Sequence, residues 1–97
     1  MSDIFEKKLA PSHDAIASAV GDETVILHLK SGAYYGLDAV GTRIWELLKE
    51  GHGPAAICAR MADEYDVAPD VLEADVRRLL GELEASEIVA DAGRADD

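Results

Sequence analysis

Histidine and cysteine side chains are the groups in this chain best suited to metal binding or nucleophilic chemistry. His13, His28 and His52 lie far apart, and no two of them have the four-residue spacing that places a metal-binding pair on one helix face. Cys58 lies alone in an apolar segment, a pattern more typical of a small buried residue than of a catalytic thiol. We therefore expect neither a catalytic residue nor a metal site.

Sequence motifs for phosphate, dinucleotide or acyl-transfer chemistry are also missing. The chain contains no P-loop, no GxGxxG fingerprint and no GxSxG nucleophile elbow. Its serines lack the Asp-Ser-Leu context of an acyl carrier protein. We therefore expect a protein that is not an enzyme and that needs no cofactor.

Size and charge narrow the remaining classes of function. The chain has 97 residues and a formal net charge of −11, so it can form one domain with a modest core. Residues 1–45 carry a net charge of −2 and residues 46–97 carry −9, and such a negative field repels nucleic acid and anionic membranes. The single cysteine excludes an internal disulfide, and no segment is apolar enough for a signal peptide or a membrane span. These features predict a small cytoplasmic domain.

The first third of the chain has the pattern of short strands. The segments 15–20 (AIASAV), 24–29 (TVILHL) and 33–37 (AYYGL) are extended and are separated by turn signals. Turns of this length predict an antiparallel meander. His28 alternates with Leu27 and Leu29, so we expect its side chain on the solvent face.

Helical periodicity begins after Asp38, which is a suitable N-cap. The first helix ends before Gly51 and has a buried face made by Val40, Ile44, Leu47 and Leu48. A second helix opens at Pro54 and a third at Pro69. The third helix carries the clearest apolar stripe, made by Leu72, Val76, Leu79, Leu80 and Leu83. The predicted fold class is α+β and winged-helix-like, with a three-stranded antiparallel N-terminal sheet followed by three helices.

The chain is expected to have three parts. Residues 1–12 form an N-terminal arm, with apolar side chains that could line one turn of helix before Pro11. The folded domain spans residues 13–90, and residues 88–89 near its end form either a short closing strand or a hydrophobic plug. Residues 91–97 form a disordered tail.

The most distinctive segment is SGAYYGLDAVGTRIWELL, residues 31–48. It combines a turn glycine, an aromatic strand ending in leucine, an aspartate, a second glycine and an aliphatic-Trp-x-Leu-Leu helix, namely Gly32, Tyr34, Tyr35, Leu37, Asp38, Gly41, Ile44, Trp45, Leu47 and Leu48. This segment resembles the PqqD-like peptide chaperones, also called RiPP recognition elements, which serve pathways that modify ribosomally made peptides. The resemblance extends over residues 14–90. Members of this length that stand alone resemble the chaperones of pyrroloquinoline quinone and lasso-peptide pathways.

The resemblance implies a peptide-binding function without catalysis. In this family a leader peptide adds as an antiparallel strand to the third strand, here residues 33–37, and a meander leaves that strand at an edge. Specificity would come from the groove between this strand and the third helix, with the candidate residues Ala33, Tyr34, Tyr35, Gly36, Leu37, Leu72, Asp75, Val76 and Leu79. Gly36 would let the peptide backbone approach or would mark a bulge.

Periodicity alone leaves the roles of the third-helix residues open. We expect one side to meet the peptide, made by Leu72, Asp75, Val76 and Leu79. Leu80 and Leu83 would then turn to the core, although the whole apolar stripe could equally be core. Trp45 is expected to pack inside the fold rather than to contact the peptide.

The implied partners are the leader of a precursor peptide and the enzyme that modifies or cleaves it, either a leader protease or a radical-SAM enzyme. The acidic second half would favour basic residues on these partners. Two alternatives belong to other classes. One is an acidic winged-helix transcriptional regulator, although residues 68–90 carry a net charge of −4, which is unfavourable for a phosphate-facing helix. The other is a small structural subunit that forms a homodimer through the edge strand at 33–37.

Overall fold

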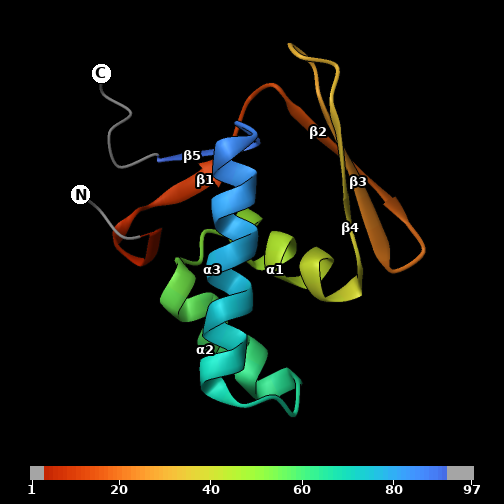
Figure 1. The fold of residues 1–97 in the computed structure, drawn as a ribbon. Helices are drawn as coiled ribbons and strands as arrows, with labels where there is room; N and C mark the ends of the chain where they lie inside the picture. Colours follow the sequence, from red (N-terminus) through yellow and green to blue (C-terminus); the bar gives the residue numbers. More distant parts are fainter. Residues whose placement is uncertain (1–3, 92–97) are drawn as a thin grey trace.

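The structure is a computed structural model, and it describes residues 4–91 (Figure 1). A helical turn, five strands and three helices follow one another in these residues: η1 (Ile4–Glu6), β1 (Leu9–Pro11), β2 (Ala15–Val20), β3 (Glu23–His28), β4 (Tyr34–Leu37), α1 (Ala39–Lys49), α2 (Pro54–Glu64), α3 (Pro69–Ala85) and β5 (Val89–Asp91). In Figure 1 the sheet β2-β3-β4 lies to one side of α3, and the pair β1-β5 lies at the other side near the C-terminal end of that helix.

The three-stranded sheet confirms the predicted meander, with strand order β2-β3-β4 and antiparallel pairing throughout. Gly21 and Gly32 occupy the two turns with φ angles of 65° and 75°, a left-handed conformation that glycine adopts without steric cost. Within the described residues, no strand pairs with the outer edge of β2 or of β4. The meander therefore leaves two edges open.

The helices begin where the sequence predicts them. The side chain of Asp38 accepts a hydrogen bond of 2.8 Å from the backbone N–H of Gly41 and caps α1. Pro54 and Pro69 occupy the first turns of α2 and α3, where the missing N–H of proline would have no partner in any case. Ion pairs of Arg43 with Glu64, at 2.7 and 2.8 Å, then tie α1 to α2.

One hydrophobic core joins the inner face of the sheet to all three helices. Ile26 from β3 and Leu37 from β4 pack with side chains of α1, α2 and α3. Every member of the predicted α3 stripe is buried, namely Leu72, Val76, Leu79, Leu80 and Leu83. In α1, Val40 is 38% exposed rather than buried, because it lies on the groove beside β4, whereas Trp45 is 3% exposed. No described helix is long and apolar enough to cross a bilayer.

The expected N-terminal arm is corrected by the structure. Residues 9–11 form β1, which pairs antiparallel with β5, and the side chains of Ile4 and Leu9 are buried in the core. Lys7 adds an ion pair of 2.8 Å with Glu84 of α3. The head is part of the domain because β5 offers it a pairing partner that is distant in sequence, so the boundary at residue 12 is wrong. Residues 88–89 do lead into a closing strand, whereas residues 1–3 and 92–97 lie outside the described part of the chain.

The orientation of His28 is also corrected. Its side chain is 4% exposed, while Leu29 is 53% exposed and falls just after the end of β3. Because side chains alternate along a strand, His28 shares the inner face with Ile26. Its Nδ1 accepts a hydrogen bond of 3.4 Å from the backbone N–H of Ser31, which satisfies one ring nitrogen in this buried position.

Candidate functional site

A groove of about 420 Å³ lies between β4, the first turns of α1 and the exposed side of α3. Its floor and walls are made by residues from all three elements, namely Tyr35, Gly36, Leu37, Asp38, Val40, Gly41, Ile44, Asp75, Arg78 and Leu79. The lining combines apolar side chains with two carboxylates and one guanidinium. The groove therefore offers limited apolar contact together with charged groups that could orient a ligand.

The outer edge of β4 runs along this groove. The backbone N–H of His28 donates to the carbonyl oxygen of Ala33 at 2.9 Å, and Tyr35 and Leu37 face Ile26 and Thr24 in the register. Hydrogen-bonded positions alternate along an antiparallel strand. Ala33, Tyr35 and Leu37 thus direct their backbone groups toward β3, and Tyr34 and Gly36 direct theirs toward the open edge.

Gly36 is not required by the fold. A Cβ placed on this residue would meet no atom within 4 Å, and its neighbours in β4 keep regular pairing with β3. The absence of a side chain is therefore compatible with close approach of another backbone, and β4 contains no bulge at this position.

A hydrogen-bond network joins β4 to α3 beside the groove. The hydroxyl of Tyr35 donates to a carboxylate oxygen of Glu82, and the other oxygen of Glu82 accepts from Arg78 at 3.1 Å. Burial, and then the hydrogen bond to Glu82, raise the pKa of Tyr35 to about 12. The hydrogen bond from Tyr35, followed by that from Arg78, lowers the pKa of Glu82 below its usual range. The network holds a neutral phenol and an ionised carboxylate across the gap between strand and helix.

The structure brings five of the nine predicted binding residues together on the groove, namely Tyr35, Gly36, Leu37, Asp75 and Leu79. Leu72 is 3% exposed and Val76 is fully buried, so both support the groove from the core beneath it. Ala33 lies just before β4, and Tyr34 is 73% exposed on the opposite face of the sheet. Strand β4 and helix α3 thus both line this groove, and the role of these residues in peptide binding stays a prediction.

Sequence reasoning missed other lining residues because they belong to neighbouring turns. Asp38, Val40 and Ile44 come from the start of α1, which folds back beside β4. Arg78 lies three residues after Asp75 in α3, and this spacing places both on one helix face. That spacing was the one signal in the sequence that could have identified Arg78.

Groups suited to catalysis do not converge on the groove. Among residues 4–91, no cluster of three or more histidine, cysteine, aspartate or glutamate side chains could hold a metal ion. Cys58 is half-buried on α2, and burial raises the pKa of its thiol, which disfavours the reactive thiolate. The groove itself presents a backbone edge, apolar side chains and charged groups.

Comparisons with known proteins agree with this geometry. The sequence model of the family described as coenzyme PQQ synthesis protein D (PqqD) matches residues 23–89. The solved structure of TbiB1 in complex with the TbiA(beta) leader peptide is 41% identical, with a TM-score of 0.79 over 82% of this chain and 93% of that chain. A lasso peptide synthetase B1 complexed with its leader peptide is 23% identical, with a TM-score of 0.79 over 86% of this chain and 98% of that chain, which shows a shared fold. No curated protein matches the chain significantly.

Proposed function

The chain belongs to the PqqD family, and on this premise we propose that it is a non-enzymatic chaperone for a ribosomally made precursor peptide. It binds the leader segment by strand addition to β4 and presents the rest of the precursor to a modifying enzyme or a leader protease in the cytoplasm. The observation that carries the proposal is the open edge of β4 beside a groove lined by both apolar and charged side chains. An edge strand with outward N–H and C=O groups pairs readily with an extended peptide.

The relatives support the peptide as ligand. TbiB1, which is 41% identical over most of this chain, forms a complex with the TbiA(beta) leader peptide. The same fold with an open β4 edge is present here. A leader peptide of a lasso-type precursor is therefore the favoured ligand, with a pathway enzyme as second partner.

The groove suggests how the leader would be selected. Backbone pairing at Tyr34 and Gly36 gives affinity with little sequence preference, so side-chain pockets must discriminate. Val40, which is 38% exposed, and Leu79 offer apolar contact. Asp38, Asp75 and Arg78 are positioned to orient charged residues of the leader. The two carboxylates at the rim outnumber the single guanidinium, and we expect a basic leader residue near them.

DNA binding receives no support from the arginines of α3. Arg77 pairs with Glu73 at 2.8 Å and Arg78 pairs with Glu82 at 3.1 Å, each within the same helix. These pairs neutralise the two side chains that a phosphate backbone would need. We therefore do not carry the regulator alternative further.

A pair of variants at Gly36 tests strand addition. Gly36→Pro removes an outward N–H without touching the β3–β4 ladder, and it should weaken binding of the leader encoded beside this gene about tenfold or more. Gly36→Ala keeps the N–H and meets no atom within 4 Å, so it should bind within about twofold of wild type and is the matched control. Fluorescence anisotropy with labelled leader gives both affinities. Equal binding by wild type and Gly36→Pro would contradict strand addition at β4.

Amide chemical shifts locate the same contact independently. Titration with the leader should shift the signals of residues 33–37 and of residues 72–79, because these segments flank the groove. Saturable binding with shifts confined to other segments would place the peptide elsewhere and would contradict the proposal.

A further inference from the structure

The second open edge of the sheet is β2, and it lacks the features that normally protect an edge strand. Every residue from Ile16 to Val20 is exposed, with Ile16 at 50% and Val20 at 60%. The segment Ala15–Val20 contains no charged residue, no proline and no glycine. Natural edge strands are usually blunted by charges, prolines or bulges because an unprotected edge recruits another strand. β2 is therefore a pairing surface on the side of the sheet away from β4.

The backbone groups that β2 offers can be assigned from its pairing. The N–H of Leu29 donates to the carbonyl oxygen of Asp14 at 2.7 Å, and Ala15 faces His28 in the register. This bond makes Ala15 and His28 a pair without hydrogen bonds to each other. By alternation, Ala17 and Ala19 turn their N–H and C=O groups to the open edge, whereas the N–H of Ala15 donates to the carbonyl oxygen of Ser12 at 3.2 Å.

The residue pattern of β2 is nearly the same in both directions about Ser18. The order Ile16-Ala17-Ser18-Ala19-Val20 has alanine on each side of serine and a β-branched residue at each end. An antiparallel pair related by a two-fold axis brings each residue opposite the position equally far on the other side of the centre, so this pattern places similar side chains opposite each other. We propose that β2 pairs with β2 of a second copy of this chain, centred on Ser18, and leaves β4 open.

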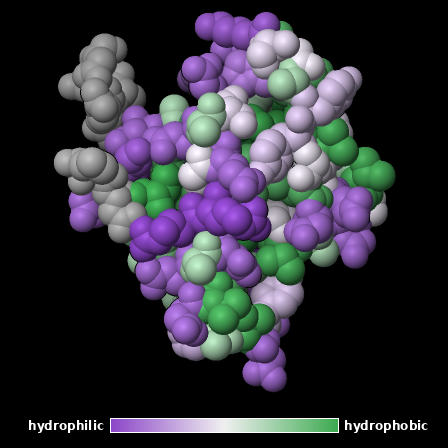
Figure 2. Space-filling model, in the orientation of Figure 1, coloured by the Kyte–Doolittle hydropathy of each residue, from purple (hydrophilic) through white to green (hydrophobic). Residues whose placement is uncertain are grey.

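This register matches side chains on both faces of the joined sheet. On the outer face Ile16 lies opposite Val20 of the second copy, and the two Ser18 hydroxyls face each other. Apolar cross-strand pairs of this kind stabilise a sheet. On the inner face Ala17 lies opposite Ala19 of the second copy, and both direct their backbone groups to the junction. Figure 2 shows apolar side chains interspersed with polar ones on the side of the molecule where the sheet lies in Figure 1.

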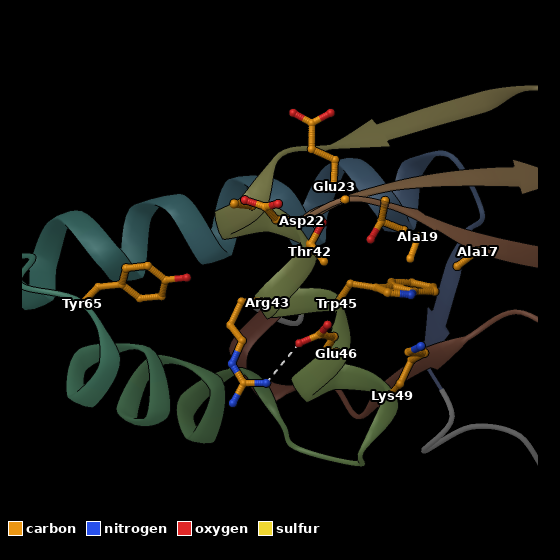
Figure 3. A pocket seen from close by; sticks show the side chains of 13 residues that line it. Ala17, Ala19, Asp22, Glu23, Thr42, Arg43, Trp45, Glu46, Lys49 and Tyr65 are labelled. Atoms are coloured by element: carbon orange, nitrogen blue, oxygen red, sulfur yellow. Dashed lines mark hydrogen bonds and ion pairs between the residues drawn. The ribbon is translucent and has the colours of Figure 1, made fainter.

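A groove of about 460 Å³ lies beneath the β2 edge, where a second copy paired with β2 would cover it. It runs between β2 and α1, and Lys49 is one of its lining residues. Figure 3 shows the ring of Trp45 lying beside Ala17 and Ala19. Trp45 is 3% exposed, and its buried Nε1–H has no hydrogen-bond partner among the described residues. Small alanine side chains leave this ring close to the edge, so a second copy would shield it further from water.

Charge distribution favours contact through this half of the molecule. Residues 1–45 carry a net charge of −2, against −9 for residues 46–97, so β2–β2 pairing keeps the acidic helical halves apart. At the ends of the pair Asp14 lies opposite Asp22 of the second copy. Lys30, whose Nζ is 3.8 Å from Asp14, supplies a cation at each end. The shared edge is one strand long, so we expect a weak dimer with a Kd of about 10–100 µM.

Sedimentation equilibrium of the full chain from about 1 µM to about 1 mM tests this pairing without any leader. Wild type should change from monomer to dimer over this range. Ser18→Lys and Ser18→Glu each place like charges directly opposite each other and should raise the Kd at least tenfold. An equimolar mixture of the two variants should recover the dimer, because the charges are then opposite. Recovery also shows that both variants are folded.

Tyr34→Lys is the matched control on the other edge, since Tyr34 is 73% exposed on β4. It should dimerise as wild type does. A wild type that stays monomeric throughout the range overturns the proposal. So does a dimer that survives in both Ser18 variants or is lost in Tyr34→Lys, because the copies would then meet through another surface. Each of these results leaves leader binding at β4 to be judged by its own measurement.

Discussion

Two adjacent leucines of α3 allow the groove to be separated from the core. Leu79 and Leu80 are 6% and 0% exposed, and only Leu79 lines the groove beside β4. Leu79→Ala and Leu80→Ala remove the same atoms from the same helix. If the leader lies in the groove, both variants lose stability but only the first loses affinity.

The expected magnitudes follow from burial. Truncating a buried leucine costs about 2–5 kcal/mol of the free energy of unfolding, which a domain with about 5–15 kcal/mol can tolerate at low temperature. The cost for Leu79→Ala should fall near the lower end, because its cavity opens into the groove. Leu79 is only 6% exposed, so its direct contact with the leader is worth a few tenths of a kcal/mol at about 25 cal/mol per Å². Its truncation also leaves a cavity in the groove wall against which the leader packs, and we expect the two effects together to cost about 1–2 kcal/mol of binding. Leu79→Ala should therefore weaken binding about 5- to 30-fold.

The assay combines urea denaturation with isothermal titration of the leader at a temperature where both variants are more than about 95% folded, so that unfolding alters the apparent affinity negligibly. Leu80→Ala should bind within about twofold of wild type. Two results would refute the reasoning. One is equal weakening by both variants, which would mean that affinity reports general stability. The other is full affinity of Leu79→Ala, which would place the peptide outside the groove.

Three further predictions concern the groups that hold the site in place. Tyr35→Phe removes the hydrogen bond to Glu82 and should cost about 0.5–1.5 kcal/mol in urea denaturation. In wild type the raised pKa of Tyr35 means that its contribution is complete below pH 10 and is lost as the pH rises to about 12; pH-dependent melting should show this decline in wild type and not in the phenylalanine variant. Asp38→Ala removes the cap of α1 and should cost about 1 kcal/mol by the same denaturation, while Asp38→Ser restores most of it; equal losses in both would contradict a capping role. Trp45→Phe removes an unpartnered buried N–H, which offsets the lost apolar contact, so the free energy of unfolding should change by less than about 1 kcal/mol; a loss above about 3 kcal/mol would contradict this offset and show that packing of the indole ring dominates.

Local patterns were sufficient for most of the individual elements. Asp38, Pro54 and Pro69 marked the helix starts, since caps and first-turn prolines act within one turn. The apolar spacing of α3 predicted its buried stripe. The meander followed from short β-branched segments separated by turns.

Two features could not be predicted from local patterns: which face of a strand is buried, and which strands pair when they are distant in sequence. His28 was assigned to the solvent face because alternation specifies two faces without saying which of them is covered. Helix α1 packs against the inner face of β3, and His28 at the end of that face lies near Ser12 and Val89. The residues before Pro11 were assigned to an arm because no local signal announces that β1 pairs with β5 across the whole length of the chain.

The amino-acid sequence by itself determined the class of protein. A −11 chain without catalytic motifs, with an aromatic strand followed by an aliphatic-Trp-x-Leu-Leu helix, is sufficient to identify the fold and the family. Composition, capping and periodicity depend on neighbours within a few residues, and the sequence displays them directly.

Tertiary structure alone decided which side chains meet at each sheet edge. Asp38, Arg78 and Leu79 converge beside β4, while Leu72 and Val76 sink into the core. Trp45 of α1 lies beside Ala17 and Ala19 of β2, although β2 comes much earlier in the chain. These groupings depend on how helices cross the sheet, which follows from the packing of the whole core rather than from any local pattern. The same packing leaves both sheet edges open, one beside the proposed leader groove and the other free for a second copy.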